Sequence, residues 1–330
     1  MGPRPVLGSV TRRAGLRGQE IVPQPLPRAA WRLGDFVVGE VLGAPGGTAL
    51  IEVTTGRMAE VAPGDQVVGA LGDRAATLEA VGGWRDVGDD GVMDALTRAG
   101  LFGRAVSVAP ATRAIMPRLR YLGHVAPHGP GRGMADVVDP PPDAVLGCPV
   151  VLVVGTSMAA GKTLAAHTVI RRLVRAGRRV AGVKLTGAAR YRDILSMADA
   201  GADPILDFVD AGLPSTIAPP EVQDAALRGL LARAAAAAPE VLVAEAGASP
   251  LEPYGGAAAV RLLAHHVAVT VLCASDPYAV LGVMRAFRLR PDVVAGWAAA
   301  TTAGRALVER LTGVPTVDLM APGGMTTLDE

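Results

Sequence analysis

The sequence predicts an α/β fold: a doubly wound, mostly parallel sheet with helices on both faces, preceded by a small β-rich N-terminal domain. Three observations lead to this prediction. Strand-length apolar runs alternate with amphipathic segments from residue 148 to 330. Short apolar runs separated by Gly/Pro turns fill 35–124. A Pro- and Gly-rich stretch at 125–147 separates the two patterns and is the expected linker.

The N-terminal region is expected to consist of an extended N-terminal segment, here called the lead, and a β-rich domain. Residues 1–34 are rich in Pro and Arg and predict the lead. Three apolar runs predict strands joined by tight turns, in a small barrel or a sandwich: DFVVGEVL (35–42), TALIEVTTG (48–56) and DQVVGALG (65–72). The segment GVMDALTRAG (91–100) is expected to be a helix that ends at Gly100.

The C-terminal region reads as alternating strands and helices. The expected strands are 149–155, 178–187, 240–247, 267–275, 293–298 and 315–320. The expected helices are 161–177, 224–239, 257–266, 279–289 and 303–313, with shorter helical pieces at 193–202 and 205–213. Strands that alternate with helices favour a parallel, doubly wound sheet.

Charge and hydropathy exclude several classes of protein. The formal net charge is +1, which does not suggest a nucleic-acid-binding surface. The longest apolar runs, 148–155 and 267–274, are far shorter than a membrane span, and the N-terminus lacks the apolar core of a secretory signal. We therefore expect a cytoplasmic protein with neither membrane nor nucleic acid as a partner. Cys148 and Cys273 lie in apolar strand patterns and are expected to be buried thiols.

Lysine is scarce in this chain. Lys162 and Lys184 are its two lysines, beside thirty arginines, and it contains no asparagine. Where a compact ammonium is not needed, arginine has replaced lysine, so the two lysines that remain mark candidate sites of chemistry.

The stretch VLVVGTSMAAGKT (151–163) predicts a phosphate-binding loop. A buried strand, a Gly-rich turn and a helix follow one another, so the first helical amides would point at an anion. Lys162 would supply an ammonium to the phosphates and Thr163 a hydroxyl to Mg²⁺. Five residues separate the two glycines, whereas the standard motif has four. The expected nucleotide-binding residues are Gly155, Thr156, Ser157, Ala160, Gly161, Lys162, Thr163 and Leu164.

GTSMAAGKT resembles the phosphate loop of dethiobiotin synthetases and their relatives, and further segments follow in the same order. In that family a lysine ends the next strand, an acid follows it, and a later strand ends in V-E-G-x-G. Here the corresponding residues are Lys184 in RVAGVKLTG, Asp193 in YRDILSM and Glu245 in VLVAEAG. A later GWVAN-like strand end is similar to AGWAAATTAG at 295–304. The resemblance covers about 148–320 and does not reach the first 140 residues.

The resemblance implies a P-loop enzyme that uses ATP and Mg²⁺. Thr163, Asp193 and Glu245 would surround the Mg²⁺. Lys162, Lys184 and Glu245 would carry the catalysis, with Lys184 facing the acceptor and neutralising charge on a transferring phosphoryl or acyl phosphate. A homodimer is expected by the same analogy.

The chain also departs from the synthetases. Ser157 stands where they carry an acid, and Ala299 and Ala300 stand where they have an asparagine for the adenine, so the base is not assigned. The substrate segments are more similar to a less characterised P-loop family, joined to a different N-terminal domain, that has been linked to N-acetylation of D-glutamate. The expected substrate-binding residues are Lys184, Thr186, Arg190, Asp210, Ser249 and Tyr254.

Three functions fit these patterns. The leading one is ATP- and Mg²⁺-dependent activation of a small carboxylate or amino-acid-like substrate, by ligation or phosphoryl transfer. The first alternative is an N-acyltransferase acting on an amino acid such as D-glutamate. The second is a nucleotide-switch NTPase that acts on a protein partner and consumes no small substrate.

Overall fold

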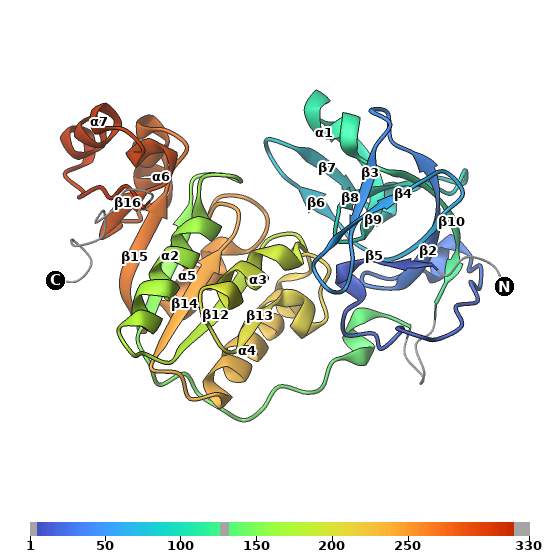
Figure 1. Ribbon diagram of the computed structural model, residues 1–330, viewed down its shortest axis with the longest axis horizontal. Helices are drawn as coiled ribbons and strands as arrows, with labels where there is room; N and C mark the ends of the chain where they lie inside the picture. Colours follow the sequence, from blue (N-terminus) through green and yellow to red (C-terminus); the bar gives the residue numbers. More distant parts are fainter. Residues whose placement is uncertain (1–4, 126–131, 320–330) are drawn as a thin grey trace. The chain divides into compact units, whose positions relative to one another are not determined.

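The computed structural model describes residues 5–125 and 132–319, and these form two compact units (Figure 1). The first unit extends from the N-terminal region to Pro140 and also includes Ala188–Arg192 and Phe208–Ala226. The second comprises Pro141–Gly187, Asp193–Asp207 and the chain from Leu227 on. The expected C-terminal domain therefore contributes two segments to the first unit, which sequence periodicity did not indicate. Residues 126–131 of the expected linker lie outside the described residues.

The first unit is built on a closed barrel. Its eight-stranded sheet has the order β1-β5-β2-β10-β8-β9-β7-β6, and because β5 also pairs with β9, five of these strands close into a ring. The short strands β3 (Ala49–Glu52) and β4 (Met58–Val61) form a separate antiparallel pair, and α1 spans Pro110–Ile115. The sheet strands are β1 (Val6–Leu7), β2 (Phe36–Gly43), β5 (Gln66–Leu71), β6 (Arg74–Ala75), β7 (Ala80–Gly83), β8 (Val92–Thr97), β9 (Leu101–Val108) and β10 (Arg118–His124).

The helix expected at 91–100 was a wrong prediction, because β8 occupies most of this segment. β8 pairs with both β9 and β10, and Met93 and Ala95 lie in the barrel core. Sheet pairing and burial here outweigh the helix propensity of Met, Ala and Leu. Gly100, with φ of 93°, turns the chain into β9.

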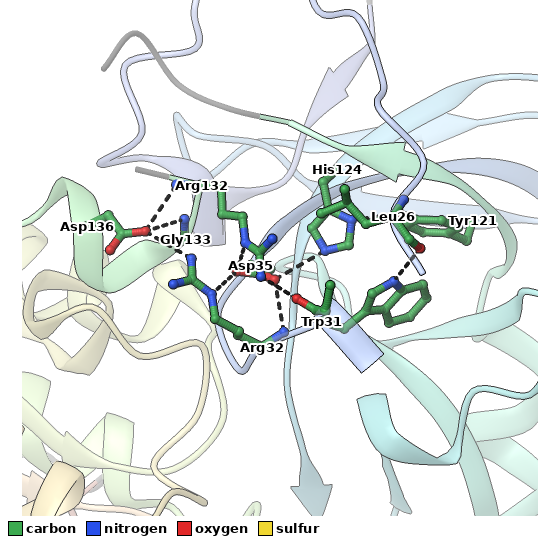
Figure 2. A network of polar contacts seen from close by, with 10 residues as sticks. Leu26, Trp31, Arg32, Asp35, Tyr121, His124, Arg132, Gly133 and Asp136 are labelled. Carbon is green, nitrogen blue, oxygen red and sulfur yellow. Dashed lines mark hydrogen bonds and ion pairs between the residues drawn. The ribbon is translucent and has the colours of Figure 1, made fainter. Parts of the chain in front are cut away.

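The expected extended lead packs into the first unit. Val10, Ala14 and Leu16 are buried, and β1 pairs in parallel with β5. Three residues of its C-terminal part, Leu26, Trp31 and Arg32, together with Asp35 directly after it, belong to a polar network that Figure 2 shows. Its centre is the buried carboxylate of Asp35, which accepts hydrogen bonds from the Arg32 amide and from the Nε atoms of Arg32 and Arg132, while His124 Nε2 lies 3.2 Å away.

The same network joins the N-terminal segment 1–34 to β10. The Tyr121 hydroxyl shares a hydrogen bond of 2.6 Å with His124 Nδ1 and accepts one from the Leu26 amide. The Trp31 indole donates to the Leu26 carbonyl, and its ring lies 4.5 Å from that of Tyr121. Because these polar groups satisfy one another, a buried carboxylate and a buried imidazole are tolerated in the unit.

Two carboxylates attach the later segments to the first unit. Glu52, at the end of β3 and 1% exposed, accepts hydrogen bonds from the Ser9 hydroxyl and from the amides of Tyr191 and Arg192. These two amides open α3 (Tyr191–Asp199), where a helix lacks internal acceptors. Asp210 is paired with Arg12 and Arg13.

The second unit contains a six-stranded parallel sheet of order β13-β12-β14-β11-β15-β16. Helix α2 packs against β11, β12, β14 and β15, and α5 packs against β12 and β14 (Figure 1). The strands are β11 (Val150–Gly155), β12 (Val180–Thr186), β13 (Ile205–Asp207), β14 (Val241–Ala246), β15 (Val267–Cys273) and β16 (Val293–Ala295). The other helices are α2 (Lys162–Arg175), α4 (Pro220–Ala236), α5 (Gly256–Leu263), α6 (Pro277–Phe287) and α7 (Thr302–Thr312).

Two expected elements differ in this region. The helical piece predicted for 205–213 is helical only at Phe208–Ala211, a 3-10 helix, and its first residues form the edge strand β13 instead. β13 pairs with β12, which overrides its local helical pattern. Of the strand expected at 315–320, Thr316 forms a single parallel bridge with Val294, and residue 320 lies outside the described residues. Cys148 and Cys273 are buried free thiols, as predicted. In the described part of the chain, every helix is too short or too polar to cross a bilayer.

Candidate functional site

Three strands bring the predicted site residues to one edge of the parallel sheet. Lys184 on β12 and Glu245 on β14 are register partners, and Glu245 also pairs with Val153 on β11. The loop that follows β11 therefore starts beside Glu245. Carboxyl ends of parallel strands are where open α/β sheets bind ligands, so the register alone places a cation and an anion at such an edge.

The loop 156–161 joins β11 to α2 in the arrangement of a phosphate loop, a strand leading through Gly-Lys-Thr into a helix. Gly161 has φ of 103°, a left-handed conformation that suits glycine. At Gly155 a Cβ would lie 2.7 Å from Lys162 Nζ and 3.0 Å from the Ala248 carbonyl oxygen, so glycine here leaves room for the lysine side chain. Both glycines of the predicted phosphate loop therefore have a structural reason, a left-handed backbone at Gly161 and room for Lys162 at Gly155.

The loop offers several unused hydrogen-bond donors. The backbone amides of 157–161 donate no hydrogen bond to any of the described residues. Thr156 differs, since its amide donates to the Cys273 carbonyl. Consecutive amides at the start of a helix form a ready site for an anion, since the helix dipole adds partial positive charge there.

Lys162 lies over this loop. Its Nζ donates to the Ser157 carbonyl at 2.7 Å, and the residue is 6% exposed. Burial lowers the pKa of Lys162, and the negative charge of Glu245 only partly opposes this effect. The negative charge of a nearby phosphate would favour the charged ammonium and raise this pKa again, so Lys162 and an anion would stabilise each other here.

Thr163 and Glu245 present oxygen atoms to each other. The Thr163 hydroxyl donates to Glu245 Oε2 at 3.3 Å. Burial, with the charge of Asp193, raises the pKa of Glu245 above its ordinary value. A hydroxyl and a carboxylate are the hard ligands that Mg²⁺ takes together with phosphate oxygens and water. The donor set fits Mg²⁺ held with a phosphate, although the described residues include no group of three acids, histidines or cysteines able to hold a metal without one.

Lys184 and Asp193 form a short ion pair. Lys184 Nζ lies 2.5 Å from Asp193 Oδ2, with the two side chains 7% and 13% exposed. Burial alone would lower the pKa of Lys184, but Asp193 and Glu245 outweigh it and raise the pKa. Asp193 was predicted as a Mg²⁺ ligand, and the structure places its carboxylate against this ammonium.

The remaining predicted substrate residues divide between the units. In the second unit Thr186 donates to the Gly247 carbonyl, Ser249 Oγ accepts from the Leu251 amide, and Tyr254 is buried. Arg190 is exposed and belongs to the first unit. Asp210, also in the first unit, is bonded to Arg12 at 2.9 Å and Arg13 at 2.6 Å. The structure therefore brings Lys184, Glu245 and the loop together, while Arg190 and Asp210 lie in a separate body.

Two residues that contact the loop were not among the predicted site residues. The Ser275 amide, just after β15, donates to the Thr156 hydroxyl at 3.2 Å. The Trp297 indole, just after β16, donates to the Ala159 carbonyl at 2.9 Å. The signal was present in the GWVAN-like similarity of 295–304, which drew attention to the strand end but not to its tryptophan.

Comparison with known proteins gives matches to solved structures alone. No family model and no curated protein matches the chain. Similar structures include chloroplast FtsY from Physcomitrella patens, with 16% identity over 54% of this chain and a TM-score of 0.39. The signal recognition particle 54 kDa protein from Aeropyrum pernix K1, in complex with GDP, has 20% identity over 55% of this chain and a TM-score of 0.36.

A third similar structure is a DUF1611 family protein from Anabaena variabilis, with 18% identity, 61% of this chain covered and a TM-score of 0.37. The matches span 60%, 42% and 64% of these three chains, so this protein aligns with only part of each. The resemblance to dethiobiotin synthetases stays a prediction.

Proposed function

We propose that the second unit binds a Mg²⁺-nucleoside triphosphate, ATP by the sequence resemblance, and directs its terminal phosphoryl group to a small carboxylate or amino-acid-like substrate. One observation carries the proposal. The loop amides 157–161 have no other acceptor among the described residues, and Lys162 beside them is bonded to a neutral carbonyl rather than to an acid. A site with this many donors suits a polyanion.

Each residue at the loop has a separable task. The amides and Lys162 would hold the phosphate oxygens, with the ammonium leaving the Ser157 carbonyl to do so. Thr163 and Glu245 would hold Mg²⁺, which supplies charge neutralisation on the phosphates when bound. Positioning and charge neutralisation are the main requirements of phosphoryl transfer, and no side-chain nucleophile is needed.

Lys184 supports transfer to an acceptor in addition to binding. It is the chain's other lysine, it is buried, and its register partner is Glu245. Its ammonium would bind the acceptor or the transferring group, either beside its hydrogen bond to Asp193 or after that bond has broken. Thr186 is the last residue of β12 and Ser249 follows β14, and these two residues are the proposed substrate contacts in this unit. Dimerisation, expected by analogy, and a cytoplasmic location, expected from the hydropathy of the sequence, stay predictions.

The test is calorimetric binding of ATP, GTP and ADP with and without Mg²⁺, followed by phosphate release with a panel of small carboxylates and amino acids. Lys162→Ala should abolish triphosphate binding, and Glu245→Gln should remove the Mg²⁺ dependence. Arg175→Ala is the matched control, because this exposed cation lies at the far end of α2 from the loop. Unchanged binding by Lys162→Ala would contradict the proposal.

The two alternatives predict different outcomes of the same test. Phosphate release that no metabolite changes but a protein partner accelerates would favour the nucleotide-switch NTPase. Binding of acetyl-CoA, with acyl transfer to an amino acid and no phosphate release, would favour the N-acyltransferase. Phosphate release that depends on a small carboxylate or amino acid would support the ligase-type enzyme.

A further inference from the structure

We propose that Trp297 is a positioning residue for the phosphate loop, and that its indole N–H fixes the direction of the Ala160 amide toward the bound anion. The inference rests on the proposed function, because it assigns a role at the same site. It adds a residue that lies outside the Gly-Lys-Thr motif and follows a different strand.

The contact is specific and lies at the middle of the loop. Trp297 Nε1 donates to the Ala159 carbonyl at 2.9 Å although the residue is 69% exposed. The chain's other two tryptophans, Trp31 and Trp84, are 5% and 9% exposed and belong to the first unit. A large apolar ring is thus held at the surface by a bond to the loop, an arrangement that core packing does not require.

The bond acts on peptide geometry. In a planar trans peptide the C=O and the N–H point in opposite directions, so the carbonyl of Ala159 sets the direction of the Ala160 N–H. The Ala160 amide is one of the donors with no other acceptor in the described part of the chain. Pulling the carbonyl toward Trp297 therefore turns this donor away from Trp297, to the other side of the peptide plane.

The loop needs such support because it holds an unfavourable conformation. Ala159 has φ of 56°, and a left-handed residue other than glycine costs about 1–2 kcal/mol. The bond between Thr156 and Ser275 secures the start of the loop and α2 secures its end. The indole bond is the side-chain contact at Ala159 between these two supports.

Gly296 brings Trp297 close enough to act. It has φ of 81°, and a Cβ there would lie 2.1 Å from the Ala160 carbonyl oxygen. The end of β16 therefore lies directly against the loop, and this close approach requires glycine. Gly296 allows the chain after β16 to lie against the loop, and Trp297, the next residue, donates its indole N–H to the loop. The two residues therefore act together.

The test separates this role from stacking of the exposed ring on a nucleobase. Trp297→Phe keeps an aromatic ring and removes the N–H. We expect it to weaken Mg²⁺-tripolyphosphate, which has no base, and Mg²⁺-ATP by the same factor, about threefold to tenfold for one neutral hydrogen bond. Gly296→Ala should weaken both probes as well, because its Cβ displaces the loop. Isothermal titration calorimetry gives both affinities, and melting temperatures check the fold.

Tyr278→Phe is the matched control, since Tyr278 is a 68% exposed aromatic on the first turn of α6. It should leave both affinities unchanged. If Trp297→Phe bound tripolyphosphate as tightly as the wild type, the positioning role of the indole N–H would be overturned. This holds whether ATP binding is also unchanged or is weakened, as stacking on the base would require. If Lys162→Ala still weakened both probes, the proposed function would stand. Failure of the wild-type protein to bind either probe would overturn both proposals.

Discussion

The ammonium of Lys184 lies 2.5 Å from Asp193 Oδ2, and both side chains are almost fully buried. The residue expected to bind Mg²⁺ is therefore the partner of the residue expected to bind the acceptor. Asp193 also contributes to the raised pKa of Glu245, so the three charges are electrostatically linked. A phosphoryl group entering the site would compete with Asp193 for the ammonium.

We predict that Asp193→Asn destabilises the protein by about 2–4 kcal/mol, because the buried ammonium loses its hydrogen-bonded carboxylate and keeps only the nearby charges of Glu245 and Asp207. Urea unfolding followed by circular dichroism measures the loss. The control is Glu240→Gln, whose carboxylate pairs with Arg178 and Arg179 at the surface and should give no measurable change. An Asp193→Asn protein as stable as the wild type would show that the pair contributes nothing to folding.

Mg²⁺ affinity should depend on the protonation of Glu245. Its pKa is raised above the ordinary value of 4.5, so part of the population is protonated at a pH somewhat above 4.5. Mg²⁺ requires the carboxylate, and its binding should therefore strengthen as pH rises through this raised pKa and level off above it, with release of a proton. Titrations of Mg²⁺ in the presence of tripolyphosphate from pH 5 to 8 measure the dependence.

Glu245→Gln provides the comparison for that profile. The glutamine cannot titrate, so the rise with pH attributable to this site should disappear while the loop still binds tripolyphosphate weakly through Lys162. A variant that kept the wild-type pH profile would assign the titration to another group and remove Glu245 from the metal site.

The two thiols should resist modification in the folded protein. Burial raises the pKa of Cys273 to about 12, and burial also raises the pKa of Cys148. At pH 8 the thiolate of Cys273 is about one part in ten thousand, so a disulfide reagent should react only after unfolding in urea. Cys148→Ser leaves Cys273 as the one thiol for this measurement, and rapid labelling of the native variant would contradict its burial at the end of β15.

Sequence patterns predicted the second unit well where local signals and the fold agree. The strand before Gly155, the helix after Gly161, and the strands with Lys184 and Glu245 have strong periodicity and clear ends. Parallel pairing then brings residues 61 positions apart, Lys184 and Glu245, into register, which follows from the fold class once the strands are known.

The rest depends on contacts that no local pattern encodes. Residues 92–97 have helix-forming composition, yet two neighbouring strands determine that they are β8. The capping of α3 by Glu52 joins residues 139 positions apart. Trp297 and Ala159 are 138 positions apart, and their bond depends on how closely Gly296 approaches the loop. Such pairings are set by tertiary packing and were not predictable from one sequence.

The stability of the first unit should depend on pH through Asp35. Burial disfavours its charge, but hydrogen bonds from His124 and the Arg32 amide, together with Arg132, outweigh burial and lower the pKa below 3.8. A carboxyl with a lowered pKa contributes stability that is complete above 3.8 and is lost as pH falls through its folded-state pKa. We predict that Asp35→Asn costs about 2 kcal/mol at pH 7.

The difference between wild type and Asp35→Asn should shrink as pH falls below 3.8, because the wild-type carboxyl then becomes neutral as well. Urea unfolding at pH values from 2 to 7 measures this difference directly, since other acids titrate equally in both proteins. Tyr121→Phe is the control: it removes the hydroxyl that contacts His124 and Leu26 and should lower stability by a similar amount at every pH. A constant difference for Asp35→Asn as well would show that Asp35 is not the titrating group, and that its bonds to Arg32 and Arg132 do not depend on its charge.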